Sequence, residues 1–289
     1  MSRIVFNQVR KRLGEFELNI PHLEIMEGYI TGFVGENGAG KTTTMKLMLD
    51  MIIADSGTIE IDGKSIRENS AEIKKEIGYV GDPTGFPEES KLKNIKRMYA
   101  PFYEKWDDKL FESYVQRFGL KMDLKYKDLS TGQKKQFALV MALSHKPRLI
   151  LLDEPTSGLD PVVRQDMLDV IMEHMQDEKV SVFYSTHITS DLERAGDYLV
   201  YIKEGNIIFN KPLDELLENY CLVSGPKELF TKEIRNDLLG CRSSKFGAEA
   251  LVQSRKVAEE IFGQEVAYSK PNIEDIMLFL SSKGGEKQW

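Results

Sequence analysis

The eight residues from Gly35 to Thr42 constrain this chain more than any other stretch, because they fit the phosphate-loop pattern G-x-x-x-x-G-K-S/T. Glycines at such positions let the backbone approach a polyphosphate and turn amide N–H groups towards it. A helix that starts directly after the loop adds its unpaired amides and the positive end of its dipole. With average residue usage, a chance match in a chain of this size is expected in about 1 % of cases. The stretch therefore predicts a site for a polyphosphate.

The residues around this loop agree with that interpretation. Tyr29 to Val34 has the character of a buried strand, and Thr43 to Leu49 that of a helix. Lys41 can reach the β- and γ-phosphates, and the Thr42 hydroxyl is a ligand for Mg²⁺. We expect contacts with the phosphates along the whole loop and the first helical turn, from Gly35, Glu36, Asn37, Gly38, Ala39, Gly40, Lys41, Thr42 and Thr43.

The composition is that of an ordinary soluble globular protein, with 289 residues, 41 % hydrophobic and 29 % charged. A net charge of -7 gives no general electrostatic reason to bind nucleic acid or anionic lipid. The longest apolar run, Phe137 to Leu143, is far shorter than a membrane span. Residues 1–20 lack the apolar core of a secretion signal, and the two cysteines suggest no disulfide framework. We expect a soluble intracellular protein that does not bind nucleic acid.

Short apolar segments between turn residues predict the strands. The first four lie at residues 4–6, 16–20, 58–61 and 77–80, with a turn at Gly14 between the first two. The Asp62-Gly63 pair predicts a hairpin after the third, and Gly81-Asp82-Pro83 stops the fourth. A later hairpin pairs residues 198–202 with residues 207–209.

Helical periodicity appears in two other regions. Residues 88–118 are charged, aromatic and helix-periodic, which predicts a helical insertion with one apolar side made by Leu92, Ile95, Met98 and Tyr99. Its aromatic residues are interpreted as core rather than as a ligand cage; they are Tyr99, Phe102, Tyr103 and Trp106. The character changes after Pro212, where short mixed elements precede a final amphipathic helix with Ile273, Ile276, Met277 and Leu280 on one face.

Two strands predicted to be buried end in side chains that can do chemistry. Residues 148–152 run into Asp153 and Glu154, and residues 180–186 run into His187. Strands buried on both faces belong in a parallel sheet, and such sheets place ligands at the carboxyl ends of their strands. An aspartate at a strand tip can hold Mg²⁺, and the adjacent glutamate can polarise a water for attack on a γ-phosphate.

One further motif, Leu129-Ser130-Thr131-Gly132-Gln133, precedes an amphipathic helix that runs to Leu143, and Ser130 suits the N-cap of that helix. It joins the phosphate loop, Asp153-Glu154, Ser157-Gly158-Leu159-Asp160 and Ser185-Thr186-His187 in the motif order of ATP-binding cassette (ABC) ATPases. Over about residues 1–212 the chain resembles this family. The serine–glycine–glutamine motif separates the family from other P-loop proteins.

The resemblance implies an α/β fold of the P-loop NTPase type, with a RecA-like, mostly parallel sheet and an antiparallel β-subdomain. It implies an ABC ATPase domain at residues 1–212, in which a helical subdomain is inserted at about residues 84–145. Residues 213–289 then form a C-terminal accessory region, expected as a small α+β extension.

The resemblance also implies a role for each residue of the catalytic motifs. Lys41 and the surrounding loop would hold the phosphates of ATP, with Thr42 and Asp153 on Mg²⁺. Glu154 would be the catalytic base. His187 would be a switch that contacts the γ-phosphate and the attacking water.

A second group of motif residues implies a partner subunit. Ser130, Gly132 and Gln133 would grip the γ-phosphate bound to a second ATPase subunit, through a hydroxyl, amides and a helix N-terminus. Asp160 would signal across the same interface. Because the chain has one phosphate loop and one such motif, dimerisation becomes a functional requirement.

Two positions depart from the family pattern. The family usually has glutamine after the strand at residues 77–80, and here the matching residue is Asp82. A carboxylate beside a triphosphate is repelled unless a cation offsets it, so we expect Asp82 to act through the water shell of Mg²⁺ and to alter coupling. At the place of the adenine-stacking aromatic stands Leu13, with Phe16 nearby. Either a weaker apolar contact replaces stacking, with weak discrimination between ATP and GTP, or Phe16 supplies it.

The sequence thus predicts the ATPase subunit of a membrane transporter, in which ATP-driven dimer closure moves separate membrane-spanning permease subunits. The second ATPase subunit is another copy or a related chain. Overall likeness favours bacterial exporters, including those for antimicrobial peptides and drugs. The chain would be cytoplasmic and peripheral on the inner face of the cell membrane, through the permease. Two alternatives stay open: a soluble ABC ATPase acting on the ribosome or nucleic acid, and a regulatory cassette without turnover.

Overall fold

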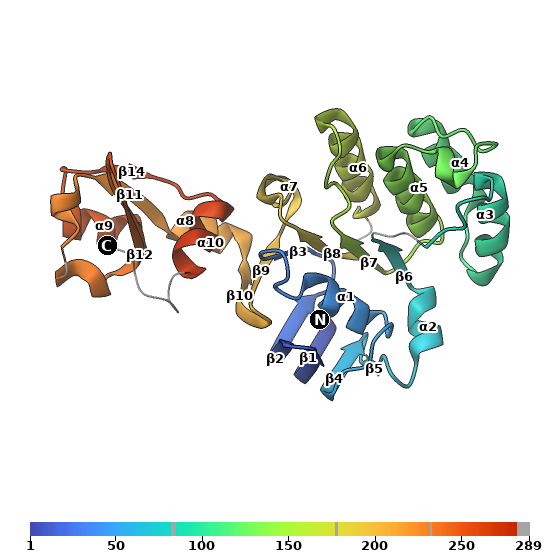
Figure 1. Cartoon of the computed structure of the whole chain (residues 1–289), viewed down its shortest axis with the longest axis horizontal. Coiled ribbons are helices and arrows are strands. Elements are labelled where there is room, and N and C mark those ends of the chain that lie inside the picture. Colours follow the sequence, from blue (N-terminus) through green and yellow to red (C-terminus); the bar gives the residue numbers. More distant parts are fainter. Residues whose placement is uncertain (82–84, 177–178, 232, 282–289) are drawn as a thin grey trace.

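The computed structural model describes residues 1–81, 85–176, 179–231 and 233–281 (Figure 1). These residues form a ten-stranded sheet followed by a four-stranded sheet. The small sheet and the C-terminal elements lie at one end of the molecule, and the helical insertion lies at the other (Figure 1). The N-terminal strands and the phosphate loop lie between them (Figure 1).

The large sheet joins a parallel half to an antiparallel half. Its strands are β1 (Ser2–Leu13), β2 (Phe16–Met26), β3 (Ile30–Val34), β4 (Ser56–Ile61), β5 (Lys64–Ser65), β6 (Ile77–Val80), β7 (Leu149–Asp153), β8 (Ser181–Thr186), β9 (Tyr198–Lys203) and β10 (Asn206–Pro212). Their order is β5-β4-β1-β2-β10-β9-β3-β8-β7-β6. The last five are parallel, whereas the β1–β2, β1–β4, β4–β5 and β9–β10 pairs are antiparallel. The predicted fold class is confirmed.

The N-terminal strands are much longer than the sequence predicted. Segments of three and five residues were expected, and β1 and β2 contain 12 and 11 residues. The difference arises because these strands bury one face only, so that His22 and Glu24 of β2 alternate with the buried Leu23 and Ile25, and β1 continues through the charged residues 10–12. Such alternation hides a strand from a search for apolar runs.

The parallel strands are buried on both faces because their successive side chains enter two different cores. In β7, Ile150 and Leu152 join the core shared with the helical insertion. Their neighbours Leu149 and Leu151 join the core formed with β1, β2 and helix α1 (Lys41–Met48). This double burial fixes the register of β7 against β8, and it brings Asp153 opposite Ser185 at the carboxyl edge.

The helical insertion contains α3 (Leu92–Tyr99), the 3₁₀ turn η1 (Ala100–Phe102), α4 (Asp108–Arg117) and α5 (Thr131–Leu143). Leu92 and Ile95 are fully buried as predicted, but Met98 is 47 % exposed. At about 100° per residue, Leu92, Ile95 and Tyr99 cluster on one side of α3, and Met98 lies beyond the edge of that cluster. The expectation that Phe102 is core is also wrong, since it is 72 % exposed in η1, after α3 has ended.

The described residues before Tyr220 contain four further α-helices. They are α2 (Ser70–Lys75), α6 (Pro161–His174), α7 (Thr189–Ala195) and α8 (Leu213–Asn219). Among the described residues, no helix is both long and apolar enough to cross a membrane.

The C-terminal region forms its own antiparallel sheet in the order β12-β13-β11-β14. Its elements are β11 (Cys221–Gly225), β12 (Leu238–Ser244), β13 (Gly247–Val252), α9 (Arg255–Phe262), β14 (Ala267–Ser269) and α10 (Ile273–Ser281). Helix α10 packs back on the part of the chain that carries the large sheet, where Ile273 and Ile276 join the same core as β7 and α5. The predicted apolar face is confirmed at these two residues, and Phe279 belongs to the buried set as well. The domain boundary at residue 212 stays a prediction.

Candidate functional site

The phosphate loop connects β3 to α1, and its backbone depends on three glycines. Gly38 and Gly40 have φ angles of +83° and +115°, where any side chain is strained. A Cβ atom on Gly35 would lie 2.4 Å from the carbonyl oxygen of Ile202. Of the other predicted contacts, Glu36, Asn37 and Thr42 are exposed, Thr43 is half-buried, and Ala39 is buried. The loop thus presents its backbone to the surface at the start of a helix.

Lys41 is almost fully buried at the first position of α1, with 7 % of its surface exposed. Its ammonium group donates hydrogen bonds to the carbonyl oxygens of Gly35, at 2.7 Å, and Glu36, at 3.2 Å. It also lies 3.8 Å from a carboxylate oxygen of Glu154. Hydrogen bonds between ionised groups are stronger than those to neutral carbonyls, so a phosphate in the loop offers this cation a better acceptor.

Thr42 and Asp153 meet at the edge of the loop. The Thr42 hydroxyl donates a 2.8 Å hydrogen bond to Oδ2 of Asp153. The other carboxylate oxygen, Oδ1, is buried and has no hydrogen-bond partner within the described part of the chain. A hydroxyl beside an orphaned carboxylate oxygen suits Mg²⁺, which takes its other ligands from water and substrate phosphates. The residues present therefore fit this metal. No cluster of three or more His, Cys, Asp or Glu in the described ranges could hold a metal without phosphates.

Glu154 and His187 lie within hydrogen-bond distance of each other, with Nδ1 of His187 2.6 Å from Oε2 of Glu154. The pairing follows from the sheet, because Glu154 directly follows β7 and His187 directly follows the adjacent parallel strand β8. Their side chains are 24 % and 52 % exposed, so that water reaches both. A carboxylate that shares a hydrogen bond with an imidazole can accept a proton from water.

Ser130, Gly132 and Gln133 lie at the start of α5. The Ser130 hydroxyl accepts a hydrogen bond from the Gln133 N–H at 3.2 Å, and the Gln133 side chain accepts one from the Ser130 N–H at 3.1 Å. This capping box confirms Ser130 as the N-cap and holds the helix end rigid. Among the described residues, no hydrogen bond joins these three to the phosphate loop of the same chain.

Asp160 caps the start of α6. One carboxylate oxygen accepts hydrogen bonds from the N–H groups of Val162 and Val163, each at 3.1 Å. This confines Asp160 to a cap geometry at an exposed turn. It shares no hydrogen bond with Glu154, although both lie in the segment that follows β7.

A cavity of about 540 Å³ opens beside the phosphate loop. Its lining consists of Arg10, Glu15, Phe16, Glu17, Asn19, Gly38, Glu204 and Asn206. Phe16 is the aromatic side chain in this set. Leu13 pairs with Phe16 across the β1–β2 turn, but it does not line the cavity and is 44 % exposed. The geometry favours Phe16 over Leu13 as the side chain that meets the base of a nucleotide.

Asp82 lies outside the described residues, so its expected role stays a prediction. The chain is described again from Gly85, and Phe86 packs its ring against those of Tyr99, Tyr126 and Phe137. Phe86 thereby anchors the chain in the helical insertion at this point.

Sequence reasoning passed over Lys135, which contacts the backbone of the site. Its ammonium group donates hydrogen bonds to the carbonyl oxygens of Glu154, at 2.8 Å, and Ser157, at 2.6 Å. A lysine two positions after Gln133 has the sequence signature of a solvated helix residue. Only the packing of α5 against the β7 turn distinguishes it.

Asp191 in α7 was also missed. This carboxylate is 1 % exposed, and it accepts hydrogen bonds from the hydroxyls of Thr156, at 2.7 Å, and Tyr184, at 2.8 Å, and from Arg164. Burial and the neighbouring Asp191 raise the pKa of the Tyr184 phenol, which keeps it protonated as a donor. Asp191 thus ties together the turns that follow Glu154, Asp160 and His187.

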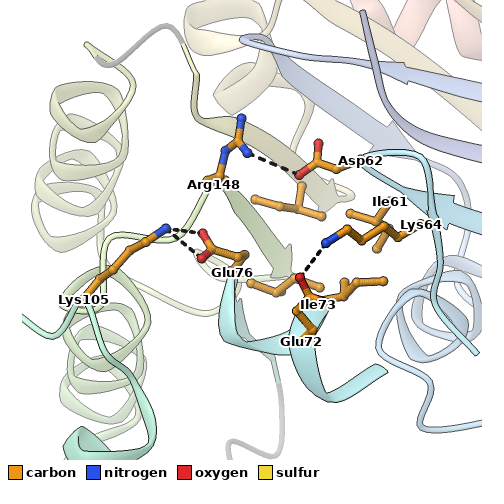
Figure 2. A pocket seen from close by; sticks show the side chains of 10 residues that line it. Ile61, Asp62, Lys64, Glu72, Ile73, Glu76, Lys105 and Arg148 are labelled. Carbon is orange, nitrogen blue, oxygen red and sulfur yellow. Dashed lines mark hydrogen bonds and ion pairs between the residues drawn. The ribbon is translucent and has the colours of Figure 1, made fainter. Parts of the chain in front are cut away.

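A second cavity, of about 320 Å³, lies at the opposite ends of β6 and β7 (Figure 2). Figure 2 shows charged side chains that are paired across it, as Lys64–Glu72, Lys105–Glu76 and Arg148–Asp62. Its lining includes Ile77 and Leu149, at the amino ends of β6 and β7, and Ile73 of α2. None of the predicted site residues lines it, and its cations already have carboxylate partners, so it is not the polyphosphate site.

Comparisons with known proteins agree with the motif order. A family model described as ABC transporter matches residues 18–157. The ABC transporter ATP-binding protein YtrB of Bacillus subtilis is 35 % identical over 198 residues, which cover 68 % of this chain and 68 % of YtrB. The bacitracin transport ATP-binding protein BcrA of Bacillus licheniformis is 32 % identical over 220 residues, which cover 75 % of this chain and 72 % of BcrA.

Solved structures support the fold. A structure described as the ATP-binding subunit of an ABC transporter gives a TM-score of 0.66 at 23 % identity, covering 74 % of this chain and 92 % of its own. A dimeric, post-hydrolysis structure of the cassette MJ0796 bound to ADP and Pi gives 0.64 at 22 % identity, covering 73 % and 98 %. The chain therefore belongs to the ABC transporter ATP-binding proteins, as the nucleotide-binding, ATP-hydrolysing subunit of a transporter of this family.

Proposed function

We propose that this chain powers an exporter by closing on a second ATPase subunit around two ATP molecules and reopening after hydrolysis. Members of the family dimerise and act with membrane permease subunits. The observation that carries the proposal is the convergence of Lys41, Glu154 and His187, joined by contacts of 3.8 Å and 2.6 Å, at the mouth of the phosphate loop.

The assignment of roles follows from that convergence. The loop amides and Lys41 bind the β- and γ-phosphates, in a position that leaves the γ-phosphate facing Glu154. Glu154 accepts the proton of the attacking water, and His187 holds the carboxylate and contacts the γ-phosphate. Lys41 neutralises part of the charge that develops on the phosphate oxygens.

Thr42 and Asp153 would hold Mg²⁺ with the β- and γ-phosphates. When bound, the metal neutralises phosphate charge and aligns the oxygens for in-line attack. Asp82 is proposed to act through the water shell of this metal. Unchanged turnover and unchanged Mg²⁺ dependence in an Asp82→Ala variant would argue against that role.

Phe16 is proposed to stack on the adenine, since it lines the cavity beside Gly38. Weak discrimination between ATP and GTP is the outcome expected if a weaker apolar contact from Leu13 replaces stacking. Equal affinity for the two nucleotides in equilibrium binding would therefore count against Phe16, and a preference for ATP would support it.

Ser130, Gly132 and Gln133 are proposed to bind the γ-phosphate held by the second ATPase subunit. The capping box supports this, because it leaves a rigid helix N-terminus with exposed Ser130 at the surface, and helix N-termini bind anions. Asp160 lies at another exposed helix start and is proposed to face the same partner.

The permease subunits are proposed to be separate membrane-spanning chains, which hold this subunit at the inner face of the membrane. The narrower proposal of an exporter for antimicrobial peptides or drugs rests on the similarity to BcrA, whose name refers to bacitracin transport. Co-purification with an integral membrane protein encoded nearby tests the permease assignment, and recovery with ribosomes instead would contradict it.

A Glu154→Gln variant tests the core of the proposal. The amide keeps the size of the side chain but cannot accept the water's proton, so turnover should stop while ATP still binds. We therefore expect ATP to trap this variant as a stable dimer, by itself or with a related cassette, in size-exclusion chromatography with light scattering. A variant that stays monomeric at saturating ATP with every candidate partner would refute the dimer mechanism.

A further inference from the structure

The backbone of Glu154 has an unusual conformation that something must hold in place. Its φ angle is +52°, in the left-handed region that a residue with a Cβ adopts only at a cost in free energy. Such strained residues persist where the surroundings over-determine them, and they concentrate at active sites. The direction of the Glu154 carboxylate depends on this angle, because the side chain leaves the backbone at the same atom.

Hydrogen bonds hold the turn from Glu154 to Ser157 through backbone N–H groups and through two backbone carbonyl oxygens. The Glu154 N–H donates to the carbonyl oxygen of Ser185 at 3.0 Å, which ties the turn to β8. The Ser157 N–H closes the turn on the Glu154 carbonyl at 3.3 Å. The Lys135 ammonium then donates to both the Glu154 and the Ser157 carbonyls. One cation therefore joins the two ends of the turn with short, charge-assisted hydrogen bonds.

Lys135 brings these bonds from a different part of the chain. It is the fifth residue of α5, two positions after Gln133, and the start of this helix is fixed by the Ser130 capping box. The neighbouring Lys134 points elsewhere, because it pairs with Glu88 at 3.1 Å and lies over the ring of Tyr126. Two adjacent lysines of one helix thus serve different contacts, and only Lys135 reaches the turn that carries Glu154.

We propose that Lys135 is a positioning residue for hydrolysis, which sets the carboxylate of Glu154 and links it to the start of α5. The inference rests on the proposed roles of Glu154 and of the Ser130 segment. In the proposed dimer, Ser130 binds the ATP of the partner subunit, whereas Glu154 acts on the ATP of its own subunit. Lys135 therefore couples the two sites. The orientation of Glu154 at its own ATP depends on how α5 contacts the ATP bound to the partner subunit.

The test compares turnover and ATP binding in the full-length chain. Lys135→Met keeps the length of the side chain and removes the ammonium group, and Lys135→Gln keeps one weaker donor. We expect kcat to fall about ten- to hundredfold in Lys135→Met, which corresponds to release of one strained backbone conformation. The KM and the equilibrium Kd for ATP should change less than about twofold, since Lys135 does not touch the phosphate loop. Lys135→Arg should recover most of the lost rate.

Lys134→Met is the matched control, with the same chemical change one position away, and it should keep the wild-type kcat and Tm. If Lys135→Met does not fold, Lys135→Gln carries the comparison, with an expected loss of about three- to tenfold in kcat. Equal losses in the Lys134 and Lys135 variants, or a rise in Kd that accounts for the whole effect, would overturn the proposal.

A double-mutant comparison separates this inference from the proposed function. Once Glu154→Gln has removed the base, Lys135→Met should cause no further loss in single-turnover hydrolysis, because residues that act as a unit are non-additive. If the rate losses of the two single variants instead multiply in the double variant, Lys135 acts independently of Glu154. If Glu154→Gln itself turned over at the wild-type rate, the proposed base would be wrong. If Glu154→Gln is inactive and the Lys135 variants are normal, only the positioning role fails.

Discussion

Replacement of the buried Asp191 carboxylate by its amide should unfold the protein at a markedly lower temperature. In Asp191→Asn the shape is kept, but the amide has one acceptor oxygen in place of the two that now serve Thr156, Tyr184 and Arg164. The amide's NH₂ group would face the Arg164 guanidinium, donor against donor. At least one buried hydroxyl or the guanidinium therefore loses its partner.

The size of the effect follows from the exposure of the partners. Breaking a buried ion pair costs about 3–5 kcal/mol when the remaining charge has no solvent. Arg164 has 26 % of its side chain exposed and also donates to Ser190 at 2.7 Å, which places the estimate at the lower end, about 3 kcal/mol. For a unit of 150–250 residues, about 3 kcal/mol lowers the Tm by roughly 6–12 °C.

Thermal and urea unfolding, followed by circular dichroism without nucleotide, measure this difference. Asp169→Asn is the control, because Asp169 pairs with Arg194 between the same two helices at the surface. Exposed pairs contribute roughly 0–1 kcal/mol, so this control should melt within about 3 °C of wild type. An Asp191→Asn variant that melts within about 2 °C of wild type would show that Asp191 is not the anchor we describe.

Three further predictions concern the side chain that contacts the adenine of ATP, the C-terminal helix, and the pH dependence of stability. Phe16→Ala should raise the Kd for ATP about five- to tenfold in isothermal titration, because one stacking contact is lost, whereas Leu13→Ala should leave the Kd unchanged. A larger effect of Leu13→Ala than of Phe16→Ala would assign the adenine contact to Leu13. Ile276→Ala removes a fully buried side chain from the core shared with the ATPase part, and it should lower the free energy of unfolding of that part by about 2–5 kcal/mol in urea; an unaffected ATPase transition would mean that α10 packs there without stabilising it. Burial lowers the pKa of His145 below its ordinary value of 6.5, so the unfolded chain takes up a proton that the folded chain refuses, and stability should fall as the pH drops below 6.5. His145→Gln should flatten that part of the Tm–pH curve, and identical curves for both proteins would exclude the histidine as the cause.

The positions of the predicted site residues in the fold were largely predictable, because these residues belong to contiguous motifs. The phosphate loop, Asp153-Glu154 and His187 occupy strand ends that a parallel sheet must bring to one edge. The start of α5 could be located from its capping residues for the same reason. In each case a local pattern determines both the element and the position of the side chain within it.

Contacts between distant segments were not predictable in the same way. Nothing in the sequence around Lys135 or Asp191 distinguishes a charged side chain that bonds to another part of the chain from one that is solvated. The choice between Leu13 and Phe16 depended on which residue faces the cavity beside Gly38, a property of the β1–β2 hairpin and not of either residue alone. Exposed Met98 shows the converse, since an apolar residue on a short helix was assigned to a face it does not reach.

The place of β10 in the large sheet has a consequence for folding during synthesis on the ribosome. β10 lies between β2 and β9, and Asn206 pairs with Asn19, which is 187 positions earlier. At about 5–20 residues per second, the ribosome needs roughly 10–40 s to reach Asn206 in β10 after it has made Asn19 in β2. During that interval the β1–β2 hairpin presents an open edge to other chains. That edge is covered only when β10 has been made and has paired with β2.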